Sequence, residues 1–497
     1  MKGAEGLHRA QGSRPGRILT GPTGTPLRGE CKPMTHKKNR PALTWTFIGL
    51  LAATAVLGGC ASVETRPTAA TNAANPLIAQ AGHLAREHAG LSGAARSDNE
   101  QQINRLLGQL DDATLSREAA ALPVGDPLYN FMGKVMMQRG LPLPRPFDRS
   151  SDWNFNAGQR PPAEADGYRP PVKLAVLLPA TGASAVAGAS VRDGLSTAYY
   201  GESRRRPDIL FYDTGSNAAG AVAAYDKAVA DGNDFVIGPL GRDEVSAVFA
   251  KGTLPVPVLA LNRGNVAPPS GNVSFSLTPE DEGIAAADYL LERGAKRVLA
   301  IGGSDDGQRR AIAALKERLA ARGAQISDTI GEGTSDLGPF VAKPGGVDAV
   351  FLAVKGSAAR TLIPKLAIVG LSDKPRVATS QLLSGTGKPE QDRVLDGLAF
   401  PSESWTSGGI RGLPPAVGVA QTLPTARGPG AARLFAFGYD AWQLSAYLER
   451  LATRPDAFIN GATGVLRIDG GGSVLRTPAW STFSSGVPVP LADAARR

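Results

Sequence analysis

Alternating strand-like and helix-like segments between residues 172 and 382 constrain the fold of this chain most strongly. Short runs of Val, Ile and Leu recur there, separated by longer segments with apolar residues at helical spacing. Such runs are typical of parallel strands that are buried on both faces. We expect strands at 173–179, 208–214, 234–240, 257–261, 296–303, 324–330, 348–354 and 376–382, and helices at 186–200, 217–231, 280–294, 307–322 and 358–369. The two series predict an α/β fold with two doubly wound lobes.

The segments around this α/β region have different patterns. Residues 76–140 show helical periodicity and predict a small region of about three amphipathic helices. Residues 141–171 are rich in Pro and predict a linker, laid against its neighbours through Trp153, Phe155 and Tyr168. At the other end we expect a helix at 434–450, a turn at 469–472 between two strands, a mobile loop at 402–430 and a tail at 484–497. The α/β domain itself is predicted to span residues 172–483.

The first sixty residues have the features of a lipoprotein signal peptide. From Met34 a short basic stretch leads into residues 41–57, which carry no charge, and then into Leu57, Gly58, Gly59 and Cys60. A basic start, an apolar core and small residues before the cut are marks of a secretory signal. We therefore predict a signal peptide at 34–59 and a tether at 60–75. The thiol of Cys60 is predicted to carry a thioether-linked diacylglycerol with palmitate-type acyl chains. The alternatives are a plain transmembrane anchor or an apolar segment that happens to end in Cys.

Residues 1–33 are rich in Gly, Pro and Arg and lack apolar periodicity, so we interpret them as a disordered upstream extension with Met34 as the true start. The leader also explains the basic composition. The whole chain carries a net charge of +9, of which residues 1–59 contribute +7 from nine basic and two acidic residues. Residues 60–497 are close to neutral, so their net charge gives no reason to expect binding to nucleic acid.

Two residue types limit the chemistry of the chain. Cysteine occurs only at positions 31 and 60, so no internal disulfide is expected once the leader is removed. The four histidines all lie at or before residue 88, which excludes the usual zinc sites and histidine-dependent triads from the α/β region. We predict no metal, no cofactor other than the covalent lipid, and no catalytic residue.

The same residues carry a family resemblance. The segments LLPATGASAVAGASVRDGLSTAYYG (177–201), FYDTGS (211–216), DFVIGPL (234–240), VPVLALN (256–262), SLTPEDEG (276–283), FGYDAWQLSAYL (437–448) and GATGVLRIDGGG (461–472) resemble the type I periplasmic-binding-protein fold. Together with the lipobox, they resemble the LppC/LpoA family of penicillin-binding-protein activators. One departure is the helical region, which is much shorter here than the helical repeats of the better-known members.

The resemblance implies an outer-membrane lipoprotein on the periplasmic face, anchored by its lipid and without enzymatic activity of its own. Its C-terminal domain would contact a class A bifunctional penicillin-binding protein and stimulate peptidoglycan cross-linking, with peptidoglycan itself as a further partner. Ala61 after Cys60 fits sorting to the outer membrane. The alternative function is a lipid-anchored receptor for an amino acid or a similar solute.

In a two-lobed α/β fold, ligands bind at the carboxyl ends of the strands. The polar and loop residues expected at those ends are Thr181, Gly182, Ser184, Asp213, Thr214, Leu240, Arg242, Asn262, Asp305, Lys355 and Gln381. Their structural alternatives stay open: residues 181–188 read as a close-packed strand–helix turn, and Asp213 reads as a cap of its own turn. Asp305 and the acids at 280–282 read as helix-start residues, and Asp440 as the start or cap of a helix.

Overall fold

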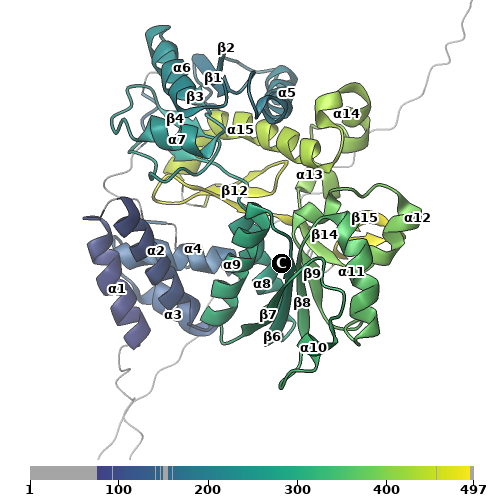
Figure 1. The fold of residues 1–497 in the computed structure, drawn as a ribbon. Coiled ribbons are helices and arrows are strands. Elements are labelled where there is room, and N and C mark those ends of the chain that lie inside the picture. Colours follow the sequence, from purple (N-terminus) through teal and green to yellow (C-terminus); the bar gives the residue numbers. More distant parts are fainter. Residues whose placement is uncertain are drawn as a thin grey trace, which may run out of the picture. The chain divides into compact units, whose positions relative to one another are not determined.

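The computed structural model describes residues 75–91, 93–139, 141–145, 147–148, 155–158, 160–454 and 456–492. The predicted leader, Cys60, the tether and Trp153 lie outside the described residues. The predicted fold class is confirmed: a helical region precedes a domain with two parallel-stranded α/β lobes (Figure 1).

Four helices form the N-terminal region, one more than the sequence pattern suggested: α1 (Pro76–His88), α2 (Gly93–Gly108), α3 (Asp112–Ala121) and α4 (Pro127–Gln138). The side chains of Asn75, Asp111 and Asp126 accept hydrogen bonds from the first turns of α1, α3 and α4. The helices enclose their own apolar cluster, which includes the fully buried Leu107 and Met132.

The first lobe contains a five-stranded parallel sheet with the order β2-β1-β3-β4-β5. Its strands are β1 (Lys173–Leu178), β2 (Asp208–Asp213), β3 (Phe235–Ile237), β4 (Val258–Ala260) and β5 (Val273–Ser274). The connecting helices are α5 (Ala185–Gly201), α6 (Ala218–Ala230) and α7 (Arg242–Phe249). All strand positions of β3 and β4 are buried, as the unbroken apolar runs predicted.

The second lobe contains a seven-stranded sheet with the order β15-β14-β10-β9-β8-β6-β7. Its parallel part consists of β6 (Arg297–Gly302), β7 (Gln325–Gly331), β8 (Ala349–Ala353), β9 (Arg376–Ala378) and β10 (Ala399–Ser402). The helices of this lobe include α8 (Pro279–Glu292), α9 (Asp306–Ala321), α10 (Gly338–Val341), α11 (Gly356–Ile368) and α12 (Pro389–Asp392).

The chain then returns to the first lobe through α15 (Pro429–Thr453), which packs along α5 (Figure 1). The two helices touch through glycines. A Cβ on Gly194 would lie 1.9 Å from the carbonyl oxygen of Phe435, and a Cβ on Gly438 would lie 1.9 Å from that of Val191. Only residues without a side chain permit this backbone approach.

The last strands complete both lobes and correct one predicted boundary. A three-stranded antiparallel sheet contains β11 (Ile459–Asn460), β12 (Val465–Ile468) and β13 (Val474–Thr477), with the predicted turn at 469–472 between the last two. The antiparallel strands β14 (Ala479–Ser484) and β15 (Val487–Pro490) join the sheet of the second lobe. The domain therefore runs past residue 483, because β15 pairs with β14 where the sequence predicted a tail.

Two other predictions were wrong. The strand expected at 376–382 ends at Ala378, and a 3₁₀ helix, η1 (Ser380–Leu383), follows it. The mobile loop expected at 402–430 consists of α13 (Ser404–Ser407), α14 (Ala416–Thr422) and η3 (Pro424–Ala426), tied to the core. Trp405 is buried and its ring stacks on Phe435, with the ring centroids 5.0 Å apart. The Gly and Pro content of this segment indicated turns, but the turns are fixed by these buried side chains.

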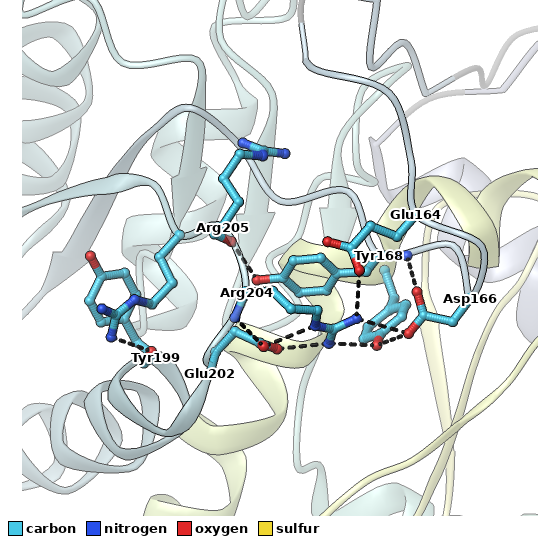
Figure 2. Close-up of polar contacts among 9 residues, drawn as sticks. Glu164, Asp166, Tyr168, Tyr199, Glu202, Arg204 and Arg205 are labelled. Atoms are coloured by element: carbon cyan, nitrogen blue, oxygen red, sulfur yellow. Dashed lines mark hydrogen bonds and ion pairs between the residues drawn. The ribbon is translucent and has the colours of Figure 1, made fainter.

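The Pro-rich segment before β1 is held on the first lobe by Arg204 (Figure 2). The guanidinium of Arg204 lies over the ring of Tyr168, 3.7 Å from its centroid, and donates to Asp166 at 2.9 Å and to Glu202 at 2.7 Å. The Tyr447 hydroxyl on α15 donates to Asp166 at 2.8 Å. The segment is therefore packed against the domain, as the aromatic residues of the linker led us to expect.

Ion pairs join the helical region to the rest of the domain. Lys134 on α4 lies 2.9 Å from the fully buried carboxylate of Asp469 and 3.4 Å from Glu100 on α2. Burial disfavours its charge, but Asp469 and Glu100 hold the pKa of Lys134 above its ordinary value. A second pair joins Asp112 on α3 to Arg322 beside α9 at 3.0 Å. The helical region thus contacts both the β12–β13 turn and the second lobe.

Candidate functional site between the lobes

The loops after β1 and β2 bind to each other. The carboxylate of Asp213 accepts hydrogen bonds from the Thr181 hydroxyl at 2.6 Å and from the backbone N–H groups of Ala180 and Gly215 at 2.8 and 2.9 Å. These donors lower the pKa of Asp213 to about 2. Asp213 is exposed, yet its oxygens are engaged in holding the two loops together. Asp213 therefore caps its own turn, which is the second of the two interpretations given in the sequence analysis.

The other predicted residues of this loop pair take part in the same joint. Gly182 has φ of +81°, and a Cβ there would lie 2.9 Å from the carbonyl oxygen of Gly215. The backbone N–H of Ser184 donates to the hydroxyl of Ser216 at 3.1 Å. The predicted cleft residues Thr181, Gly182, Ser184 and Asp213 therefore lie together, and the two loops that carry them bind each other.

The residues after β2, β3 and β4 form a second joint. Thr214 is fully buried and its hydroxyl donates to Glu244 at 3.3 Å. Burial raises the pKa of Glu244. The Asn262 side chain donates to the carbonyl oxygen of Leu240 at 2.9 Å, and Arg242 is the exposed first residue of α7.

The predicted residues of the second lobe separate into two places. Asp305 is the N-cap of α9 and accepts from the backbone N–H of Gln308 at 3.2 Å, so its interpretation as a helix-start acid is correct. Gln381 accepts from the Gln308 side chain at 2.8 Å. Lys355 is the exposed N-cap residue of α11, and no side-chain capping bond is formed there.

A cavity of about 300 Å³ lies where the start of α15 faces the second lobe. Of the predicted residues, Gln381 alone lines it. The second lobe contributes the starts of α8 and α9 and the turn η1, and the chain between the lobes contributes Glu403. Three charged residues that the sequence analysis did not assign to the cleft line it: Glu282, Glu403 and Arg433.

Arg433 on α15 binds both carboxylates. Its guanidinium lies 2.5 Å from Glu282 on α8 and 3.4 Å from Glu403, and it also contacts the Ser380 hydroxyl. Glu282 accepts from the backbone N–H of Ser380 at 2.8 Å. The side chains of the two carboxylates are only 5% and 3% exposed and that of Arg433 is 17% exposed. An element packed on the first lobe is thus tied to the second by a nearly buried ionic network.

The electrostatics of this network favour the ionised state. Burial acts to raise the pKa of Glu282, but Arg433 and the two hydrogen bonds from Ser380 bring it below the ordinary value for glutamate. Glu282 is therefore more than a helix-start acid, which corrects the interpretation made from its position in the run 280–282. No local sequence pattern predicts the network, because Glu282 and Arg433 are 151 positions apart in the chain.

Asp440 also has a different role from the predicted one. It lies in the middle of α15, fully buried, and accepts from the backbone N–H groups of Ala462 and Thr463 at 2.6 and 2.7 Å. The Thr463 hydroxyl donates to it at 2.6 Å. Burial raises the pKa of Asp440 to about 6. Asp440 fixes the loop before β12 and neither begins nor caps a helix.

The ionisable groups that line the cavity bind one another. The charged side chains of the cavity are two carboxylates that share one guanidinium, and no histidine lies after residue 88 of the chain. In the part of the chain that the structure describes, no cluster of His, Cys, Asp and Glu could hold a metal ion. Within the same described residues, no helix is both long and apolar enough to cross a membrane.

Comparison with known proteins shows which families the chain resembles. Residues 171–409 match the profile of periplasmic binding proteins, and residues 334–486 match that of the LppC lipoproteins. Penicillin-binding protein activator LpoA of Photobacterium profundum is 28% identical over 361 residues, which are 64% of this chain and 57% of the relative. The C-terminal domain of this chain is similar to the LppC/LpoA family.

Solved structures share the fold of the C-terminal domain. The LpoA C-domain from Haemophilus influenzae, a regulator of PBP1A, superposes with a TM-score of 0.55 at 21% identity, over 64% of this chain and all of that domain. A protein of Chromobacterium violaceum assigned to branched-chain amino acid ABC transport has a TM-score of 0.51 at 28% identity, over 63% of this chain and all of the other. The LppC match at 334–486 distinguishes the chain from proteins that match the periplasmic-binding-protein profile alone.

The LppC/LpoA relatives are longer than the aligned region. The alignments with the first three span 57%, 44% and 55% of the lengths of those relatives. The LppC profile covers β8, α15 and the β12–β13 hairpin, so the Arg433 side of the cleft and the Asp440 loop both lie in the family-specific region.

Proposed function

We propose that this protein is an outer-membrane lipoprotein that activates a class A penicillin-binding protein through protein–protein contact. The observation that carries the proposal is the similarity of the C-terminal domain to the LppC/LpoA family, together with relatives named as penicillin-binding protein activators. The related C-domain from Haemophilus influenzae is described as a regulator of PBP1A. Cys60 would provide the membrane anchor, and the domain would reach the synthase from the periplasmic face.

The contacts within the cleft favour a protein-binding role over a solute-binding role. In a solute receptor the ligand completes the contact between lobes, and its polar groups need partners on both sides. Here Arg433 on α15 already binds Glu282, Ser380 and Glu403. The chain itself supplies the contacts that a solute would make. The solute-receptor function is therefore less favoured than the activator function. The domain binds its protein partner through its outer surface.

The proposal is tested by reconstitution. The lipid-free chain from residue 61 onward is mixed with a class A penicillin-binding protein of the same cell and with lipid-linked disaccharide-peptide substrate. We expect a complex in a pulldown and a larger cross-linked fraction in the peptidoglycan product. The matched control is an amino-acid receptor of the same fold, which should do neither. Absence of both binding and stimulation at equimolar amounts would contradict the proposal.

The anchor is tested separately in cells. Radiolabelled palmitate should enter the protein, and the label should disappear in Cys60→Ala. The labelled protein should fractionate with the outer membrane. An unmodified chain that begins at Met1 would refute the predicted start at Met34 and the lipid on Cys60 together.

A further inference from the structure

The strand β2 forms one edge of the sheet of the first lobe, and no strand of the described residues pairs with its outer side. The backbone N–H of Asp208 donates to Val172 and that of Thr214 to Leu178, at 3.0 and 3.2 Å. Because alternate residues of a strand point their N–H and C=O groups to opposite sides, the even-numbered residues face β1. The backbone groups of Ile209, Phe211 and Asp213 are therefore directed to the open side.

The other edges of the two large sheets are protected. At one edge of the second lobe, β15 contains Pro488 and Pro490, which remove N–H donors. At its opposite edge, β7 pairs with β6 through an irregular register. In the first lobe, the far edge is closed because Ser274 on β5 donates to Gly472 at 2.9 Å. Prolines, bulges and covering segments are the usual ways to block strand pairing at an edge. The six residues of β2 include neither a proline nor a bulge.

The side chains of β2 are also unusually apolar for an open edge. Leu210 is 48% exposed and Phe211 is 47% exposed, and as neighbours they point to opposite faces of the sheet. An open, apolar edge is a template for pairing with another strand. These observations on the edge do not depend on the proposed function.

We propose that β2 pairs in antiparallel orientation with β2 of a second copy of this chain, around a two-fold axis at Phe211. This register places Phe211 opposite Phe211 of the second copy, Leu210 opposite Tyr212, and Ile209 opposite Asp213. Asp208 then lies opposite Thr214, so no like charges face each other. All three outward-facing residues find a backbone partner. An isologous contact of this kind requires such self-complementarity.

The neighbouring register is less favourable. A two-fold axis at Leu210 places Asp213 opposite Pro207, which has no N–H to donate. The Phe211 register uses every residue of β2. A single strand pair buries less surface than the roughly 800 Å² per partner of a stable interface. The association is therefore expected to be weak in dilute solution, and a covalent trap is the suitable measurement.

The trap uses Phe211→Cys in the lipid-free chain with Cys60 removed, which then contains no other cysteine. In the proposed register the two Cα atoms lie about 5.5 Å apart, within the range of a disulfide. Leu210→Cys is the matched control, because it is equally exposed but offset from its copy. Its two Cα atoms lie about 8 Å apart, beyond the range of a disulfide.

Under mild oxidation, Phe211→Cys should form a dimer on a non-reducing gel at least tenfold more than Leu210→Cys. Equal trapping of both variants, or of neither, would overturn the proposal. Circular dichroism checks that both variants fold. A second measurement needs no cysteine: Phe211→Lys places like charges opposite each other and should shift sedimentation toward the monomer. If the unmodified chain sediments as a monomer at all concentrations up to the millimolar range, the proposal also fails.

Discussion

Replacing Arg433 by Met tests whether the ionic network holds the two lobes together. Met keeps most of the length and volume of the arginine stem but removes the charge. Glu282 and Glu403 then lose the cation that pairs with both of them, although their side chains are only 5% and 3% exposed. The backbone N–H and hydroxyl of Ser380 would still bind Glu282, so part of the site stays satisfied.

The magnitude follows from the burial of the two carboxylates. Removing one partner of a buried ion pair destabilises a protein by about 3–5 kcal/mol, because a buried charge loses its compensation. The 17% exposure of Arg433 allows some solvent screening, which favours the lower end of that range. For a domain of this size each kcal/mol lowers Tm by roughly 2 °C, so we expect a decrease of about 6–8 °C.

The assay is thermal and urea unfolding of the lipid-free chain, with Arg192→Met as the control, since the Arg192 side chain is 49% exposed. A pH series adds a second readout. The pKa of Glu282 is below its ordinary value in the folded protein, so its contribution is present above pH 4.5 and is lost as the pH falls. The difference between the unmodified chain and Arg433→Met should therefore shrink as the pH falls below 4.5. A Tm change below 2 °C, or a difference that does not depend on pH, would refute the reasoning.

Three further predictions concern other buried contacts. Asp440 has a pKa of about 6 in the folded protein and of 3.8 in the unfolded chain. The free energy of unfolding should therefore fall by about 3 kcal/mol as the pH rises from 3.8 to 6. Urea unfolding at several pH values should show this decrease, and Asp440→Asn should abolish it. Lys134→Met leaves the buried Asp469 unpaired and should cost about 3 kcal/mol, seen as faster hydrogen exchange in the helical region. Gly194→Ala should lower stability by about 1–3 kcal/mol through its clash with α15, whereas Gly201→Ala, with open space around it, should change Tm by less than 1 °C.

The sequence pattern predicted the parallel strands because their burial is local information. Each run of Val, Ile and Leu, such as the one at 349–353, is buried along its whole length. The strand end at Ala378 was missed for a long-range reason. The chain turns into η1 there, and the turn presents the Ser380 backbone N–H and hydroxyl to Glu282 on a different helix. Nothing in the run 376–382 contains that information.

The candidate site shows the same division. Loop polarity located the joint between Thr181 and Asp213, since residues at the ends of neighbouring parallel strands meet at one edge of the sheet. Composition could not show whether those groups are free. It also missed Arg433 and Asp440, which lie on a helix of ordinary amphipathic pattern and act on residues brought to them by the fold.

The network at Arg433 leads to one more prediction, about ligand addition. A receptor gains stability from its solute by mass action, about 2.7 kcal/mol at a concentration of one hundred times Kd, which would raise Tm by roughly 5 °C. Here side chains of the chain itself make the contacts between α15 and the second lobe. An added molecule would have to displace Arg433 from two buried carboxylates. The free energy lost by that displacement is about as large as the free energy gained from binding a solute at one hundred times its Kd. A thermal-shift screen with amino acids and peptidoglycan fragments should therefore show no stabilisation above 1 °C. A reproducible increase of several degrees with one compound, abolished in Arg433→Met, would mean that the network yields to a ligand.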